Sequence, residues 1–231
     1  MRRAVIQLKD VWKTYRMGEH EVHALRGASL EVWEGEFLAI KGPSGSGKST
    51  MMNLVGCLDV PSKGIILLDN KNISHMTESD LAQIRGRKIG FVFQKFNLLP
   101  NLTAMENVML PLIFQGVPID KRRLIASSVL ADMGLAERMH HTPNQLSGGE
   151  QQRVAIARAL AVNPEVILAD EPTGNLDSNT GAKIMALLRE LNTKHKKTVV
   201  FVTHDDKLAE HADRIAYLSD GQVVKTKEIK T

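Results

Sequence analysis

A glycine-rich segment at residues 42–49 constrains the fold of this chain more than any other feature. A continuous apolar run at 37–40 leads into it, as is typical of a strand buried on both faces of a parallel sheet. The segment matches the pattern G-x-x-x-x-G-K-[ST], and a helix should follow it. Such glycines allow backbone N–H groups to surround phosphate oxygens, so the segment predicts a phosphate-binding loop. It comprises Gly42, Pro43, Ser44, Gly45, Ser46, Gly47, Lys48 and Ser49.

The end of this loop carries the side chains with the clearest expected roles. Lys48 can reach the β- and γ-phosphates of a nucleotide, and the hydroxyl of Ser49 can ligate Mg²⁺. Thr50, the next residue, is assigned to the same nucleotide site. The helix expected from Lys48 to about Leu58 adds the positive end of its dipole. The loop predicts nucleotide binding but does not say which reaction follows.

Bulk properties exclude several classes of protein. With 231 residues, the chain is long enough for one large domain, or for a core that carries a smaller insert. The net charge is +4, but the basic residues form only short clusters beside acidic ones, so we expect no nucleic-acid partner. The single Cys57 excludes an internal disulfide and a cysteine-based metal cluster, and we expect it to be a small buried residue. No signal peptide or spanning segment is apparent, so we expect any membrane link to run through a partner protein.

The order of apolar patterns predicts an α/β nucleotide-binding core interrupted by an all-helical insert. We assign residues 1–94 and 162–231 to the core with its β subdomain, and 95–161 to the helical part. Half-buried strands are expected at 5–8, 22–25 and 28–32, and a further strand at 64–68. Buried strands are expected at 37–40, 88–93, 166–169, 198–203 and 215–218, and helices at 105–114, 124–133 and 150–161.

Two carboxylates follow the apolar strand expected at 166–169. A carboxylate at the C-terminal end of such a strand is placed to hold the metal ion of a phosphate site. We therefore expect Asp170 to hold Mg²⁺, and Glu171 to orient or deprotonate the attacking water.

A second helix start with anion-binding character lies at residues 146–153, which read Leu-Ser-Gly-Gly-Glu-Gln-Gln-Arg. Ser147 is a good N-cap, and two glycines open the helix. A helix N-terminus attracts a phosphate, yet one chain has only one nucleotide to offer. The alternative is a capped surface helix with flexible glycines. Here the chain resembles the ABC ATPase family, whose signature segment is L-S-G-G-Q/E.

The resemblance implies roles for further residues. In that family the signature segment, here Ser147, Gly148, Gly149 and Glu150, binds the γ-phosphate of ATP held by the other subunit. Tyr15 would stack on adenine, and Gln94 would sense Mg²⁺, the water and the membrane partner. Asp177 would lie in the segment that crosses the dimer interface, and His204 would hydrogen-bond the γ-phosphate. The implied fold is a RecA-like P-loop core with an N-terminal antiparallel β subdomain and a helical signature subdomain.

The detailed sequence of four segments resembles one branch of this family, which contains the lipoprotein-releasing ATPases, the macrolide-exporter ATPases and the division ATPase FtsE. The segments are residues 56–59, 91–100, 102–108 and 169–177. The branch implies a Mg²⁺-dependent ATPase that forms a head-to-tail homodimer around ATP and drives export, extraction or mechanotransmission. Its permease, with a large external domain, is expected on a separate polypeptide, which places this chain in the cytoplasm on the inner face of the membrane.

Other classes of protein share some of these motifs. DNA-repair and chromosome-structure members of the family carry long coiled-coil arms, for which about a hundred residues between loop and signature leave too little chain. A translation factor of the family would repeat the motifs, and a small-molecule kinase would not need residues 146–153. A division-linked, FtsE-like regulator that transports no substrate stays open. The transported substrate is not encoded in any of these motifs.

Overall fold

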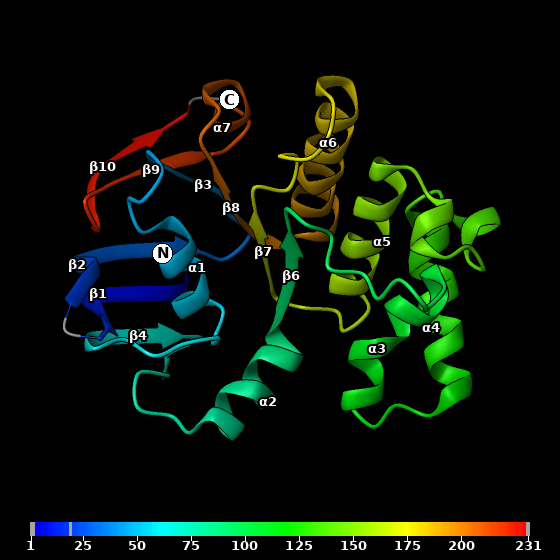
Figure 1. The fold of residues 1–231 in the computed structure, drawn as a ribbon, viewed down its shortest axis with the longest axis horizontal. Helices are drawn as coiled ribbons and strands as arrows, with labels where there is room; N and C mark the ends of the chain where they lie inside the picture. The colour runs from blue at the N-terminus through cyan, green and yellow to red at the C-terminus, as the bar shows by residue number, and fades with distance from the viewer. Residues whose placement is uncertain (1–2, 19, 230–231) are drawn as a thin grey trace. The chain divides into compact units, whose positions relative to one another are not determined.

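The computed structural model of the chain describes residues 3–18 and 20–229. The ranges 1–94 and 162–231 expected for the core and β subdomain include residues 1–2, 19 and 230–231, which lie outside the described residues. The chain forms two compact units, and Figure 1 labels their elements. The first unit comprises Met1–Arg85 with Leu191–Thr231, and the second comprises Gly86–Glu190. The two units are described separately below.

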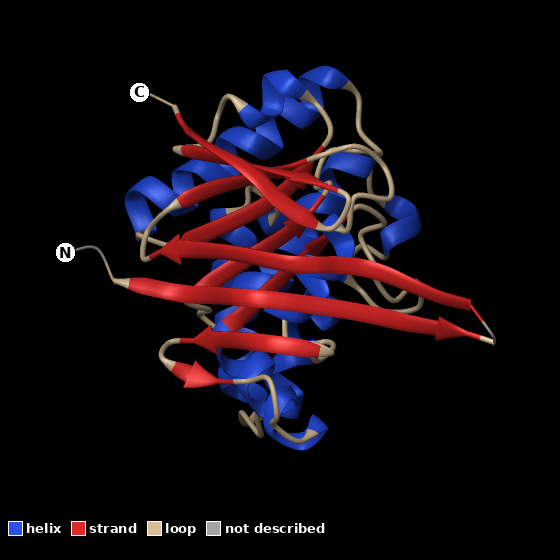
Figure 2. Ribbon diagram, turned by 90° about the vertical axis from the view of Figure 1, so that its left-hand side faces the viewer, coloured by secondary structure: helices blue, strands red, loops and turns tan. Residues whose placement is uncertain are grey.

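The first unit contains a four-stranded antiparallel sheet in the order β2-β1-β4-β5. Two strands of 14 residues each, the edge strand β2 and its neighbour β1, form its longest pair (Figure 2). They are longer than the strands expected at 5–8, 22–25 and 28–32, because bulges interrupt the alternation of buried and exposed residues. One bulge lies between Leu8 and Val11, where Asp10 has φ +48°. The bounds are Ala4–Met17 (β1), His20–Trp33 (β2), Lys63–Leu68 (β4) and Lys71–Asn72 (β5).

The first unit also contains three parallel strands, with β3 between β8 and β9, and β10 antiparallel to β9. All five residues of β3 except the last are buried, as are all six of β8, and the rings of Phe37 and Phe201 lie 5.0 Å apart. The buried strands expected here are confirmed. The bounds are Phe37–Lys41 (β3), Thr198–Thr203 (β8), Arg214–Ser219 (β9) and Gln222–Glu228 (β10), with helices Lys48–Val55 (α1) and Asp206–Ala209 (α7).

A buried ion pair fastens the start of β3 to β9. The guanidinium of Arg214 donates to both carboxylate oxygens of Glu36, at 2.7 and 3.0 Å. The side chain of Glu36 is 4% exposed and also accepts from the backbone N–H of Trp33. Arg214 donates in addition to the carbonyl of Glu31. Every oxygen of the buried carboxylate is therefore hydrogen-bonded.

Replacing Arg214 with Met is expected to lower the free energy of unfolding by about 3–5 kcal/mol, because the carboxylate of Glu36 then stays buried without its cation. Urea denaturation followed by circular dichroism measures the loss. The control is Arg16→Met, which breaks the pair between Arg16 (83% exposed) and Glu21, and should change stability by less than about 1 kcal/mol. Equal losses of unfolding free energy in the two variants would show that burial does not make the pair of Arg214 and Glu36 more important for stability than an exposed pair.

The second unit contains a parallel pair of strands and the helices that the sequence predicts. The strands β6 and β7 pair from Ile89 with Val166 to Phe93 with Asp170. The bounds are Ile89–Phe93 (β6), Val166–Asp170 (β7), Ala104–Phe114 (α3), Ile119–Asp132 (α4) and Gly148–Leu160 (α5), with 3₁₀ turns at Ala136–Arg138 and Pro143–Gln145. Two further helices, Glu78–Lys88 (α2) and Ser178–His195 (α6), contain residues of both units.

Local signals explain where these helices begin. α3 starts at a capping box in which Thr103 and Glu106 bond each other's backbone N–H groups. α4 begins at Ile119 rather than at 124, because Pro118 sets the start and the charged residues of the first turn hide its apolar spacing. α1 ends at Val55, earlier than expected, and Gly56 follows it.

Cys57 is buried just beyond α1, as the sequence predicts. Burial raises the pKa of its thiol to about 11, because the interior disfavours the thiolate. The thiol is therefore neutral at physiological pH, which fits a residue used for packing.

Candidate nucleotide-binding and catalytic residues

The phosphate loop of the first unit lies between β3 and α1, and backbone carbonyls pack directly behind two of its glycines. A Cβ atom on Gly42 would lie 2.1 Å from the carbonyl oxygen of Leu218, and one on Gly47 would lie 2.4 Å from that of Ala24. Gly47 also has φ +100°, where other residues are strained. Glycine is therefore required at both positions by the packing of the unit.

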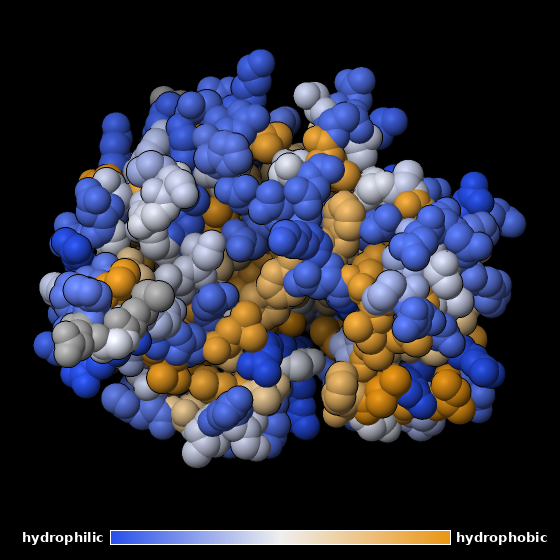
Figure 3. All heavy atoms as spheres, in the orientation of Figure 1, coloured by the Kyte–Doolittle hydropathy of each residue, from blue (hydrophilic) through white to orange (hydrophobic). Residues whose placement is uncertain are grey.

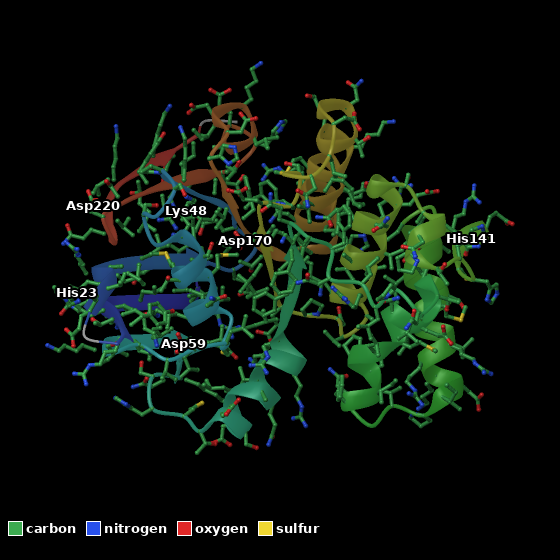
Figure 4. The ribbon with its side chains drawn as sticks, in the orientation of Figure 1. His23, Lys48, Asp59, His141, Asp170 and Asp220 are labelled. Atoms are coloured by element: carbon green, nitrogen blue, oxygen red, sulfur yellow. The ribbon has the colours of Figure 1, made fainter. Side chains whose placement is uncertain are left out.

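The donors of this loop suit a polyphosphate. The ammonium of Lys48 donates to the carbonyls of Gly42 (2.9 Å) and Pro43 (2.7 Å), and its side chain lies at the start of α1 (Figure 4). The N-cap Gly47 supplies no side-chain acceptor to the first turn of α1. Among the described residues, the buried hydroxyl of Ser46 has no hydrogen-bond partner. An ammonium, a hydroxyl and the N–H groups of a helix N-terminus together fit the phosphates of a nucleotide.

The residues expected to hold Mg²⁺ all offer oxygen ligands. Ser49 is exposed on the first turn of α1, with Thr50 half-buried beside it. Asp170 offers a carboxylate and Gln94 an amide oxygen. Nowhere in the described part of the chain do three His, Cys, Asp or Glu side chains gather as a metal cage. These few oxygen ligands fit Mg²⁺, which binds through one or two protein groups together with phosphates and water.

His204 lies near the phosphate loop in the first unit, and its expected bond to the γ-phosphate stays a prediction. It follows β8 and lines a hollow of about 360 Å³ that Gly42 and Pro43 also line. Lys41 lines the same hollow and is ion-paired with Asp206 at the start of α7. The structure thus brings the expected switch histidine and the start of the loop to one hollow.

Tyr15, the residue expected to stack on adenine, is half-buried on β1. Its hydroxyl donates to the carboxylate of Asp59 at 3.0 Å, and the ammonium of Lys13 lies 4.9 Å from its ring centroid. The stacking role remains a prediction.

In the second unit, the ends of β6 and β7 bring three expected residues together. Asp170 is the last residue of β7 and pairs with Phe93, so Gln94 and Glu171 each directly follow the end of one of two neighbouring strands. Figure 4 shows Asp170 at this strand end. Glu171 has φ +44°, a left-handed conformation that is strained for any residue with a Cβ. Strain of this kind concentrates at functional sites.

Gln94 packs closely against the segment that follows Glu171. Its carboxamide donates to the side-chain oxygen of Asn175 at 3.5 Å, and Asn175 donates back to the carbonyl of Gln94 at 2.9 Å. A Cβ on Gly174 would lie 2.7 Å from the amide nitrogen of Gln94. Glycine at 174 therefore makes room for the Gln94 side chain.

The capped helix expected from Ser147 onward is confirmed, and its binding of a phosphate stays a prediction. Ser147 is the N-cap of α5, and its hydroxyl accepts from the N–H of Glu150. The carboxylate of Glu150 accepts from both the N–H and the hydroxyl of Ser147, each at 2.8 Å. These hydrogen bonds lower the pKa of Glu150 and keep it ionised. Arg138 lies 3.5 Å from the same carboxylate.

The start of α5 packs against the segment that contains Asp177. A Cβ on Gly149 would lie 2.6 Å from the side chain of Thr180, and one on Gly148 would lie 3.2 Å from that of Leu176. Asp177 accepts from the N–H groups at 179 and 180, at 3.1 Å each, and so caps α6. Hydrogen bonds from Thr180 lower the pKa of Asp177. The two expected interface segments therefore lie against each other.

Comparison with known proteins agrees with this geometry. The sequence profile described as "ABC transporter" matches residues 25–174, well over half of the chain. The chain belongs to the ABC transporter family. It is 55% identical over 230 residues to an uncharacterized ABC transporter ATP-binding protein of Methanocaldococcus jannaschii, MJ0796, covering 98% of each chain.

Two further likenesses refine the family assignment. The dimeric structure of MJ0796 in a post-hydrolysis state, bound to ADP and Pi, superposes with a TM-score of 0.90 at 53% identity, covering 98% of this chain and 99% of that one. The macrolide export ATP-binding/permease protein MacB of Hyphomonas neptunium is 49% identical over 95% of this chain, which spans 34% of that protein. The predicted P-loop fold and the macrolide-exporter branch are confirmed, and this ABC protein is an ATPase.

Three residues of this ABC ATPase hold the expected site residues or their segments in place, although the sequence motifs assign them no role. Gln152, fully buried in α5, donates to the carbonyl of Pro172 at 2.6 Å and ties the helix to the segment after β7. An amide among apolar helix positions is a readable sign of such a role. Lys13 and Asp59, which hold Tyr15, have no comparable signal, because their contact depends on the tertiary structure.

Proposed function

We propose that this ATPase powers a separate membrane permease through ATP-driven closure of a head-to-tail homodimer. The observation that carries the proposal is the start of α5. Its N-cap Ser147 is exposed, and the half-buried Gly148 and buried Gly149 form the first turn, whose N–H groups are suited to bind a phosphate. MJ0796 is dimeric with ADP and Pi bound, which supports the same arrangement here. In the proposed dimer, each phosphate loop faces the Ser147 helix of the partner.

The capping box of α5 gives this contact a switchable donor. The hydroxyl of Ser147 donates to Glu150 at 2.8 Å. A γ-phosphate that arrives from the partner can take over this hydroxyl, while Glu150 keeps the backbone N–H of Ser147 and remains near Arg138. The phosphate then receives charge-assisted hydrogen bonds from the hydroxyl and from the N–H of Gly149.

The remaining roles follow from the chemistry of each side chain. Lys48 and the loop N–H groups bind the β- and γ-phosphates, and His204 donates to the γ-phosphate. Ser49, Asp170 and Gln94 would hold Mg²⁺, which neutralises phosphate charge when bound. Glu171 takes the proton of the attacking water. Tyr15 stacks on adenine, and the segment at Asp177 crosses the dimer interface.

Hydrolysis reverses the closure. Loss of the γ-phosphate removes the contacts at Ser147 and Gly149, so the dimer opens. Because positioning supplies most of the catalysis in phosphoryl transfer, turnover depends on closure. We further propose that 1–94 and 162–231 form the β subdomain and core, and that 95–161 form the helical subdomain that transmits the motion.

A permease partner is supported by MacB, in which an ATPase region like this chain makes up only about a third of the protein. Within the described residues, no helix is long and apolar enough to cross a bilayer. The second unit exposes apolar side chains at the end of α3 and the start of α4, gathered in one area of Figure 3. Phe114 is 88% and Leu124 72% exposed, with Ile113 and Ile119 nearby in sequence at 47% and 42%. We propose that a cytoplasmic segment of the permease covers this apolar surface and holds the chain at the membrane.

The test is capture of the permease. Tagged protein is incubated with detergent-solubilised membranes of its own source, and the proteins retained are identified by mass spectrometry. We expect a multi-spanning protein with a large external domain. Replacing Phe114 and Leu124 with Ser should reduce its recovery by at least about tenfold, because a few central apolar anchors dominate most interfaces.

Ile65→Ser is the matched control, since Ile65 is an exposed apolar residue (42%) on β4 of the first unit. It should leave the recovery of the permease unchanged, and the ATPase activity of all variants without membranes should equal that of the wild type. Equal recovery with and without the Phe114 and Leu124 substitutions would contradict the docking surface. Capture of no membrane protein would contradict the permease itself.

A further inference from the structure

The ring of Tyr15 is fixed from two sides within the first unit. Its hydroxyl donates to one carboxylate oxygen of Asp59 at 3.0 Å. The ammonium of Lys13 lies over one ring face, 4.9 Å from the centroid. Lys13 and Tyr15 are two residues apart on β1, so their side chains leave the strand on the same face. The ring thus has one face covered by a cation and its polar end anchored.

Lys13 and Asp59 are themselves held in place. The ammonium of Lys13, a residue only 9% exposed, donates to the other carboxylate oxygen of Asp59 at 2.6 Å and to the carbonyl of Val60 at 2.8 Å. The same oxygen of Asp59 accepts from the N–H of Val60 at 2.7 Å. Each polar atom of the cluster therefore has a fixed partner.

The charges of the cluster agree with this arrangement. Burial disfavours ionisation of Asp59, but hydrogen bonds from Lys13, Val60 and Tyr15 outweigh it and lower the pKa of the carboxyl group. Burial and the neighbouring carboxylate raise the pKa of Tyr15. At neutral pH an ionised Asp59 therefore accepts from a neutral phenol, which is the pairing that fixes the ring.

The cluster is connected to the phosphate loop by one short helix. α1 begins at Lys48, and Asp59 lies four residues beyond its last residue, Val55. Figure 4 shows Lys48 and Asp59 at opposite ends of this helix. The residue expected to bind phosphate thus begins this helix, and the residue that anchors the ring follows shortly after its end.

We propose that Lys13 and Asp59 are positioning residues that hold the Tyr15 ring ready to stack on a nucleobase, and that they favour purine over pyrimidine nucleotides. The inference rests on the stacking role proposed for Tyr15. With one face covered by Lys13, the ring offers only its other face to a base. A ring held in advance loses no freedom when the nucleotide binds, and a purine gains most because it has the larger stacking area.

The test compares steady-state hydrolysis of ATP and CTP in single variants. Lys13→Met and Asp59→Asn should each raise KM for ATP by about five- to tenfold and KM for CTP by less than about twofold, with kcat for both nearly unchanged, because only stacking is weakened. Lys13→Arg keeps the cation and its donors, so its KM for ATP should stay close to the wild-type value. Tyr15→Phe, which loses only the hydroxyl, should fall between wild type and Asp59→Asn.

The controls separate the possible failures. Arg16 lies on β1 next to Tyr15 and forms an exposed ion pair with Glu21. Arg16→Met breaks this pair and should change KM for neither ATP nor CTP. If Tyr15→Ala leaves KM for ATP unchanged, the stacking role proposed for Tyr15 is wrong. If Tyr15→Ala raises KM for ATP while Lys13→Met and Asp59→Asn do not, the positioning role is wrong. An equal rise of KM for ATP and CTP in these variants, or lower kcat at unchanged KM, would also overturn it.

Discussion

Replacing Glu171 with Gln is expected to abolish ATP hydrolysis and to trap the protein as an ATP-bound dimer. Glu171 directly follows β7, and its strained φ of +44° holds the side chain at the strand end. Without the carboxylate no group takes the proton of the attacking water, so turnover should fall by about 10²–10⁴-fold. ATP then persists, and the contacts that close the dimer persist with it.

Phosphate release measures the loss of turnover, and light scattering after gel filtration with ATP measures the mass. Glu165→Gln is the matched control, because Glu165 lies just before β7 in a partly exposed pair with Lys88 at 3.2 Å. This control should hydrolyse ATP like the wild type and show no trapped dimer. An ATP-bound monomer of Glu171→Gln would exclude the nucleotide-sandwiched dimer.

Replacing Ser147 with Arg is expected to remove turnover while leaving ATP binding by the monomer nearly intact. The bulky cation blocks the start of α5, where the partner's γ-phosphate is proposed to bind. It also breaks the capping box, which destabilises the helix by about 1 kcal/mol. Turnover should fall by at least about 10²-fold, because a donor to the transferring phosphate is lost. Binding is measured by calorimetry without Mg²⁺, and turnover by phosphate release.

Thr103→Arg separates the loss of the cap from the loss of the phosphate contact. Thr103 forms the same capping box with Glu106 at the start of α3, with the two hydrogen bonds to the Glu106 carboxylate at 2.8 Å, as at Ser147. This variant should lose similar stability but keep its turnover. Equal turnover in Ser147→Arg and the wild type would show that the start of α5 does not serve a nucleotide.

Mixing the two inactive variants tests whether the site is shared between chains. A mixed dimer of Glu171→Gln and Ser147→Arg contains one site in which both Glu171 and the partner's Ser147 are intact. When the two variants are mixed as monomers and ATP is then added, random pairing makes half of the dimers mixed, and each mixed dimer has one complete site. Early turnover should therefore reach about a quarter of the wild-type value, before ATP-trapped Glu171→Gln dimers accumulate. No recovery on mixing would contradict contribution of Ser147 in trans.

Much of this fold is predictable because its signals are local. The phosphate loop follows a strand with no polar interruption, and Ser147 with Glu150 marks the start of α5. α6 has a similar local signal, although it is not among the helices expected above. Its buried Ile184, Leu188 and Leu191 follow helical spacing, and Asp177 caps it.

The rest depends on contacts between distant segments. Bulges displace the alternation in β1, so its length becomes visible only in its pairing with β2 and β4. Lys13 and Asp59 are 46 residues apart, and neither stands in a pattern that predicts their contact. Glu36 and Arg214, 178 residues apart, meet only because β3 and β9 are neighbours in the sheet.

The glycines of the phosphate loop have an evolutionary consequence. Gly42 and Gly47 are confined from behind, by the carbonyls of Leu218 and Ala24, whether or not a nucleotide lies in front of them. A descendant that lost ATP hydrolysis would still need both glycines in order to fold. It could replace Glu171 at no such penalty, and a glycine there would also relieve the backbone strain. In distant relatives, an intact loop therefore indicates a shared architecture, whereas the glutamate proposed to activate water would distinguish active ATPases from inactive ones.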